Sequence, residues 1–136
     1  MDIRYNTDIY KCEVLAVADE RIEVGEYIQA FNDLTAQNIP CGKIYQSSGL
    51  KTHVERHHPD EVDLIRYVPD VIREPEYIGK HPKEGSSVEL IKKINKNVMV
   101  CIKLDNKNGY LYVASVFSIS EAKLNNRLNS GRVKRC

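Results

Sequence analysis

Residues 88–119 read VELIKKINKNVMVCIKLDNKNGYLYVASVFSI, and this stretch decides the fold class. It contains three runs rich in Val, Ile, Leu, Phe and Tyr, namely VELIKKI, VMVCIKL and YLYVASVFSI. β-Branched and aromatic residues are enriched in strands. Asn108 and Gly109 lie between the last two runs and form a strong signal for a hairpin turn. The stretch therefore predicts an antiparallel sheet.

The flanking segments predict a strand before this stretch and a helix after it. GKIYQSSG (42–49) is a short run bounded by glycines, and it predicts a strand that ends in a Ser-Ser-Gly turn. On the other side, Ser120 is suited to cap the helix SEAKLNNRLNSG, and Gly131 is placed to end it.

The N-terminal half has helical patterns. Within VGEYIQAFNDLTAQNIP (24–40) apolar residues recur at the i, i+3, i+4, i+7 spacing of an amphipathic helix. LKTHVERHH (50–58) predicts a short helix, Pro59 is suited to begin the next one, and Pro69 to kink or end it. YKCEVLAVAD (10–19) fits a strand or a short helix, and we favour the strand. Helices followed by an antiparallel sheet predict an α+β fold.

Length and composition indicate a single folded domain. The chain has 136 residues, of which 42% are hydrophobic and 29% charged, and this balance is typical of globular proteins. No stretch approaches the roughly 20 apolar residues of a membrane span. The N-terminus has neither the apolar core nor the cleavage site of a signal peptide. We therefore expect no membrane partner and a cytoplasmic location, or delivery by a carrier that the sequence does not show.

The charge is distributed unevenly along the chain. Residues 1–87 carry 10 Lys and Arg against 16 Asp and Glu, whereas residues 88–136 carry 10 against 3. A basic half beside an acidic one indicates a polyanion partner. A solvated basic helix and tail would produce the same asymmetry.

Three of the four histidines lie within SSGLKTHVERHHP (47–59). On a helix His53 and His57 share a face, and His58 points about 100° away from His57. Zinc requires three or four protein ligands, and the HExxH pattern is absent because Glu55 follows Val54 rather than a histidine. Acid/base catalysis of phosphodiester cleavage fits histidines near basic residues. A solvated helix that happens to be rich in histidine is the third interpretation, and the pattern leaves all three open.

Four segments taken in order resemble a known family: GKIYQSSGLKTHVERHHP, YVPDVIREPEYIGKHP, SSVELIKKINKNVMVCIKL and GYLYVASVFSISEAKLNNRLNSGRVKR. They are similar to the phage-type nuclease domains of the barnase, EndoU, colicin and RelE (BECR) superfamily, found in polyvalent proteins of mobile elements and in bacterial toxins. The resemblance covers roughly residues 42–135. It implies a nuclease domain over 42–136 and leaves 1–41 as an N-terminal extension packed on it.

The resemblance implies a fold and a set of catalytic residues. The fold would have N-terminal helices packed on a roughly four-stranded antiparallel sheet, with a C-terminal helix. The activity would be metal-independent RNA cleavage without a cofactor. His53 and His58 match the ends of the family's His-x4-His-Pro element. Lys103 matches a basic position on a strand, and Ser115 a hydroxyl position on the next strand.

Further residues are expected to bind the substrate. Lys51, His57 and Arg127 would lie near the phosphate. Tyr112 or its neighbour Tyr110 would stack on a base, although packing within the sheet is the favoured role for each ring.

The implied function is a toxin-type endoribonuclease that cleaves tRNA or another RNA by attack of a 2′-OH and leaves a 2′,3′-cyclic phosphate. RNA would be its partner, together with a cognate immunity or antitoxin protein. Two alternatives stay open: a catalytically inactive RNA- or protein-binding module of the same fold, and a histidine-dependent metal hydrolase.

Overall fold

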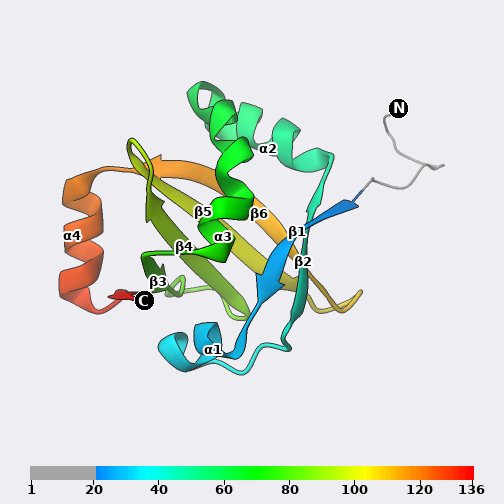
Figure 1. Cartoon of the computed structure of the whole chain (residues 1–136), viewed down its shortest axis with the longest axis horizontal. Coiled ribbons are helices and arrows are strands. Elements are labelled where there is room, and N and C mark those ends of the chain that lie inside the picture. Colours follow the sequence, from blue (N-terminus) through cyan, green and yellow to red (C-terminus); the bar gives the residue numbers. More distant parts are fainter. Residues whose placement is uncertain (1–20) are drawn as a thin grey trace.

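A seven-stranded sheet runs through residues 21–136, the part of the chain that the computed structural model describes. Its strands are β1 (Arg21–Tyr27), β2 (Gly42–Ser47), β3 (Tyr77–Gly79), β4 (Ser87–Lys93), β5 (Asn97–Asp105), β6 (Tyr110–Ile119) and β7 (Val133–Arg135). They lie in the order β1-β2-β6-β5-β4-β3-β7 (Figure 1). The β2–β6 pair is parallel, and the other pairs are antiparallel.

The helices pack on the two faces of this sheet. They are α1 (Gln29–Thr35), α2 (Gly49–His57), the 3₁₀ helix η1 (Pro59–Tyr67), α3 (Val68–Arg73) and α4 (Glu121–Ser130). Figure 1 shows α3 lying across the sheet, α2 at the top of the view and α4 at the left. Within the described residues, no helix is long and apolar enough to cross a membrane.

Successive side chains along each strand point to opposite faces of the sheet. We call the face that packs against α1, α2, η1 and α3 the closed face, and the opposite face the open face. On β5, Val98, Val100 and Ile102 are buried in the main core, which also includes buried residues of α1, α2, η1 and α3. The residues between them on β5 point to the opposite face. There Met99 belongs to a smaller apolar cluster with Leu124 of α4. The rest of that open face carries the polar side chains of the candidate site.

The elements predicted around residues 88–131 are confirmed. The three β-rich runs form β4, β5 and β6, which pair antiparallel in that order. The Ser120 Oγ accepts a hydrogen bond from the Lys123 backbone N–H at 3.1 Å, and this bond caps α4. Gly131 ends the helix with a φ of 83°, which is the left-handed conformation that favours glycine. The strand predicted at 42–49 and the short helix predicted at 50–58 correspond to β2 and α2.

The single helix predicted over 24–40 is wrong in its first part, which forms β1 before the short α1 begins. The register with β2 shifts between Glu23 and Gly25, so that Val24 is an extra residue in the strand. A bulge of this kind changes which face the following side chains occupy. Val24 and Tyr27, three residues apart, are consequently both buried. A bulged strand thus reproduced the spacing of an amphipathic helix.

The α+β class and the C-terminal helix are confirmed, but the predicted four-stranded antiparallel sheet behind N-terminal helices is wrong in detail. The sheet is larger, it is mixed, and a strand comes first among residues 21–136. The break predicted near Pro69 is present: η1 ends at Tyr67, and Pro69 lies in the first turn of the next helix, α3, where a missing N–H costs little. The strand predicted at 10–19 lies outside the described residues. The division between 1–41 and 42–136 stays a prediction, and β1 and β2 pair across it.

Candidate active site

A cleft of about 360 Å³ lies on the open face, lined by residues of β4, β5 and β6 together with side chains from α2, α4 and the segment before β4. Four sequence-predicted residues line it: His53, Lys103, Ser115 and Arg127. They are contributed by α2, β5, β6 and α4 in that order. The fold thus brings together residues that lie up to 74 positions apart in the chain.

The floor of the cleft is set by strand register. Glu89 on β4 lies opposite Cys101 on β5, and Cys101 lies opposite Ser115 on β6. The register between β5 and β6 then shifts just after Cys101. As a result, the consecutive residues Ala114 and Ser115 both line the cleft. Burial, followed by the negative charge of Glu89, raises the pKa of the Cys101 thiol to about 12, so this thiol stays protonated at neutral pH.

His53 occupies the wall formed by α2. Leu50 and Val54 of this helix are buried in the main core, and His53 stays exposed beside the cleft. Its ring lies 4.6 Å from the His57 ring, centroid to centroid. Partial desolvation at the cleft lowers the pKa of His53, and the nearby charge of His57 lowers it further. The neutral imidazole, which can accept a proton, is therefore favoured at neutral pH.

His58 does not share the helix face of the other two histidines. Helix α2 ends at His57, and His58 has φ −143° and ψ 64°, outside the helical region. Its ring stacks on Phe117 of β6 with centroids 4.6 Å apart and planes 17° apart. Phe117 itself lines the cleft. His58 itself is not among the residues that line the cleft, and its stacking on Phe117 places it next to the cleft.

The coupling between His53 and His57 makes a prediction that does not depend on activity. A protonated His57 repels a proton on His53, so the His57→Ala variant is expected to raise the pKa of His53 toward its ordinary value. NMR titration of the His53 Cε1–H resonance measures this pKa. The exposed Thr52→Ala variant of the same helix serves as control and should leave it unchanged. A His53 pKa that falls or stays constant in His57→Ala would contradict the prediction.

Lys103 is held by a carboxylate at the edge of the cleft. Its Nζ lies 2.7 Å from Oε1 of Glu84, in the loop before β4. This hydrogen bond raises the pKa of Lys103 and lowers that of Glu84. The ammonium group therefore remains charged across the neutral range. Glu84 is half exposed, so an incoming anion can compete with it for Lys103.

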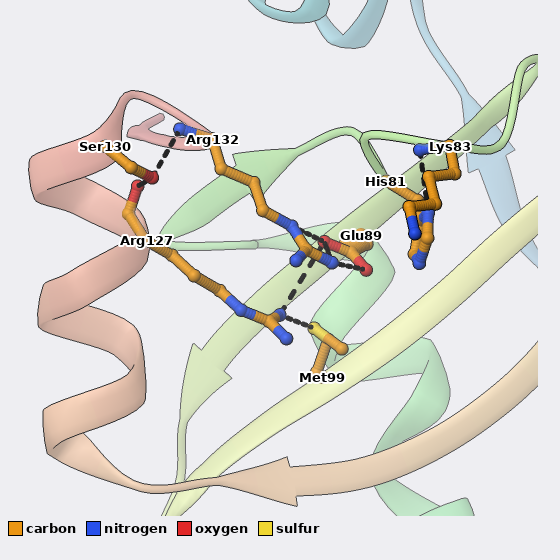
Figure 2. A network of polar contacts seen from close by, with 7 residues as sticks. All are labelled: His81, Lys83, Glu89, Met99, Arg127, Ser130 and Arg132. Atoms are coloured by element: carbon orange, nitrogen blue, oxygen red, sulfur yellow. Dashed lines mark hydrogen bonds and ion pairs between the residues drawn. The ribbon is translucent and has the colours of Figure 1, made fainter.

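Glu89 is the centre of a network that sequence reasoning missed. Its carboxylate is buried and receives three hydrogen bonds of 2.9 to 3.3 Å from the Arg132 guanidinium. Nη1 of Arg127 lies 3.7 Å from the same carboxylate and donates to the Met99 Sδ at 3.2 Å. Figure 2 shows both arginines reaching toward Glu89, Arg127 from α4 and Arg132 from just beyond it. Two cations thus face one anion at the cleft.

His81 is the fourth histidine of the chain and a second group that sequence reasoning left without a role. It lines the cleft from the segment between β3 and β4. Its Nδ1 accepts a hydrogen bond from the Lys83 backbone N–H at 3.1 Å (Figure 2). In the neutral ring the proton is therefore on Nε2. The GKHP segment of the quoted motifs contained this histidine, but a lone His-Pro pair does not indicate chemistry.

Lys51, His57 and Tyr112 lie outside the lining of the cleft. Lys51 is exposed on α2. Tyr112 on β6 is directly opposite Lys103 on β5, so its ring is a neighbour of the cleft. Among residues 21–136, no group of three or more His, Cys, Asp or Glu side chains is arranged to hold a metal ion.

The family described as phage-Barnase-EndoU-ColicinE5/D-RelE like nuclease3 matches residues 22–126. This range includes all of β1 except Arg21, the helices α1 to α3, and the lining of the cleft except Arg127 and Arg132. No curated protein and no solved structure matches the chain significantly.

Proposed function

We propose that this chain, which belongs to the phage Barnase-EndoU-ColicinE5/D-RelE like nuclease family, cleaves RNA at this cleft without a metal ion. Family membership establishes the nuclease type, and the substrate and mechanism are our inference. The observation that carries the proposal is that His53, Lys103 and Ser115 line one cleft although they come from three separate elements. An imidazole with a lowered pKa beside a fixed cation is suited to proton abstraction next to a phosphate.

The cleavage step can be written in terms of these groups. Neutral His53 removes the proton from a ribose 2′-OH, and that oxygen attacks the adjacent phosphorus. The new O2′–P bond forms as the P–O5′ bond breaks. His58 in its protonated form donates a proton to the departing O5′. The products are a 2′,3′-cyclic phosphate and a 5′-OH, and RNA is required because DNA lacks the attacking hydroxyl.

Charge and hydrogen bonding at the cleft would stabilise the transition state. Lys103 and Arg127 carry positive charge to the position where the phosphate gains negative charge. The Ser115 hydroxyl faces the cleft and is suited to donate a hydrogen bond to a phosphate oxygen. His57 and Lys51, both exposed on α2, would attract the backbone of the RNA.

The biological role that fits this chemistry is a toxin-type effector. A metal-independent cleavage of tRNA would need no cofactor supply in the cell where it acts. A cognate immunity or antitoxin protein would then cover the cleft. The choice of RNA is tested together with the chemistry.

The experiment is incubation of the purified chain with tRNA, total RNA and single-stranded DNA, each with and without EDTA. We expect cleavage of RNA in both conditions, no cleavage of DNA, and 2′,3′-cyclic phosphate ends. Loss of RNA cleavage in EDTA would favour the metal hydrolase, and cleavage of DNA would exclude attack by a 2′-OH. Binding of RNA with no cleavage under any condition would favour an inactive module.

A further inference from the structure

Three tyrosines lie together on the open face beside the cleft, and we refer to Tyr45, Tyr110 and Tyr112 as the tyrosine patch. The rings of Tyr45 and Tyr110 are 6.3 Å apart with planes at 75°, and those of Tyr110 and Tyr112 are 6.0 Å apart with planes at 54°. All three side chains are partly exposed. They come from β2 and β6, which are the parallel neighbours in the sheet.

Strand alternation places the patch on the same face as the catalytic candidates. Ile44 and Leu111 are register partners and are buried in the main core. Their neighbours Tyr45 and Tyr112, also register partners, therefore point to the opposite face. Core packing, the usual role of a tyrosine in a sheet, does not account for these rings.

The tyrosine patch lies in the same cross-strand row of side chains as Lys103. Tyr45 lies opposite Tyr112, and Tyr112 lies opposite Lys103. Neighbouring strands are about 4.8 Å apart. The two rings are therefore one and two strand spacings from the lysine that faces the proposed phosphate position. This separation suits nucleotides that flank the scissile bond.

A cation accompanies the rings. The Arg21 guanidinium carbon lies 4.2 Å from the centroid of Tyr110 and 5.8 Å from that of Tyr45. Arg21 is exposed, so its charge is available to a ligand that approaches the patch. Aromatic faces next to an arginine form the combination that binds single-stranded nucleic acid, because bases stack on the rings and the cation attracts the backbone.

We propose that the tyrosine patch binds unpaired nucleobases next to the cleaved bond, and that the enzyme therefore acts on single-stranded stretches of RNA, such as loops, and not on duplexes. This inference rests on the proposed ribonuclease function for its biological meaning. Bases inside an A-form duplex are stacked on each other, and their faces are not accessible to side chains. An unpaired strand can turn its bases onto the sheet while its backbone crosses the cleft.

The test uses a non-cleavable ligand, so that binding is measured apart from catalysis. A single-stranded 2′-O-methyl oligoribonucleotide lacks the attacking hydroxyl, and its affinity is measured by fluorescence anisotropy alongside the same sequence in a duplex. The wild-type chain should bind the single strand at least tenfold more tightly. Tyr45→Leu should weaken binding by about tenfold, within the range measured for loss of one stacked base. Tyr45→Phe keeps the ring and should bind like the wild type.

The controls separate failure of the patch from failure of the ribonuclease. Arg21→Gln changes an exposed side chain, should leave the melting temperature unchanged, and should weaken binding and reduce its dependence on salt. It keeps the proposal testable if Tyr45→Leu fails to fold. Equal affinity in wild type, Tyr45→Leu and Arg21→Gln would overturn the patch, as would equal affinity for duplex and single strand. Ring-dependent binding without any RNA cleavage would support the patch and reject the ribonuclease.

Discussion

Replacing His53 with alanine is expected to lower kcat/KM for RNA cleavage by about 10²- to 10⁴-fold, the usual contribution of a positioned acid or base. The proposed 2′-OH attack has no base once this imidazole is gone. The fold should be unaffected, because His53 is exposed on α2 and alanine is the best helix former. Initial rates on an RNA oligonucleotide and a thermal melt measure the two quantities separately.

Thr52→Ala is the matched control for this variant, since Thr52 is the exposed neighbour of His53 on the same helix. Its rates should equal those of the wild type.

The pH dependence of kcat/KM gives a second check on the role of His53. A lowered pKa of His53 means that kcat/KM should still be high just below the ordinary histidine pKa of 6.5 and should fall at more acidic pH, as His53 becomes protonated. Nearly full activity in His53→Ala would assign the base elsewhere, with His81 the next histidine at the cleft.

Local sequence predicts those parts of the fold in which the pattern of apolar and turn residues is regular. Strands β4, β5 and β6 are seven to ten residues long, and the turn between β5 and β6 contains Asn108-Gly109. Strands β3 and β7 have three residues each, too few for a period of two to be visible. The parallel pairing of β2 with β6 joins residues that are far apart in the chain, so no local pattern could indicate it.

The same distinction applies to the candidate site. The order of the family motifs predicts His53, Lys103 and Ser115 as site residues, and all three line the same cleft. Glu89 was missed because it is one of three charged residues in VELIKKI, and charged positions of a strand usually face solvent. Its partner Arg132 is 43 positions away, in a tail whose basic residues looked solvated. A charged residue inside a run that is otherwise buried was the one signal available, because such a charge needs a partner.

Replacing Glu89 with glutamine is expected to lower the free energy of unfolding by about 3–5 kcal/mol, the typical cost of removing one partner from a buried ion pair. Glutamine keeps the shape of the side chain but removes its charge. The Glu89 side chain is 5% exposed, and those of Arg127 and Arg132 are 15% and 23% exposed. The variant therefore leaves two partly buried cations facing each other without an anion. Urea denaturation followed by circular dichroism measures the change.

Glu84→Gln is the control that distinguishes the loss of a buried ion pair from the loss of an exposed one. Glu84 also binds a cation at the cleft, with its carboxylate 2.7 Å from Lys103, but its side chain is 44% exposed. Solvent screens this pair and replaces the lost contact, so the control should be nearly as stable as the wild type. Equal losses in the two variants would mean that pairing alone matters at this cleft. No loss in Glu89→Gln would mean that the two arginines do not need Glu89, and that each is held by other contacts such as the one between Arg127 and Met99.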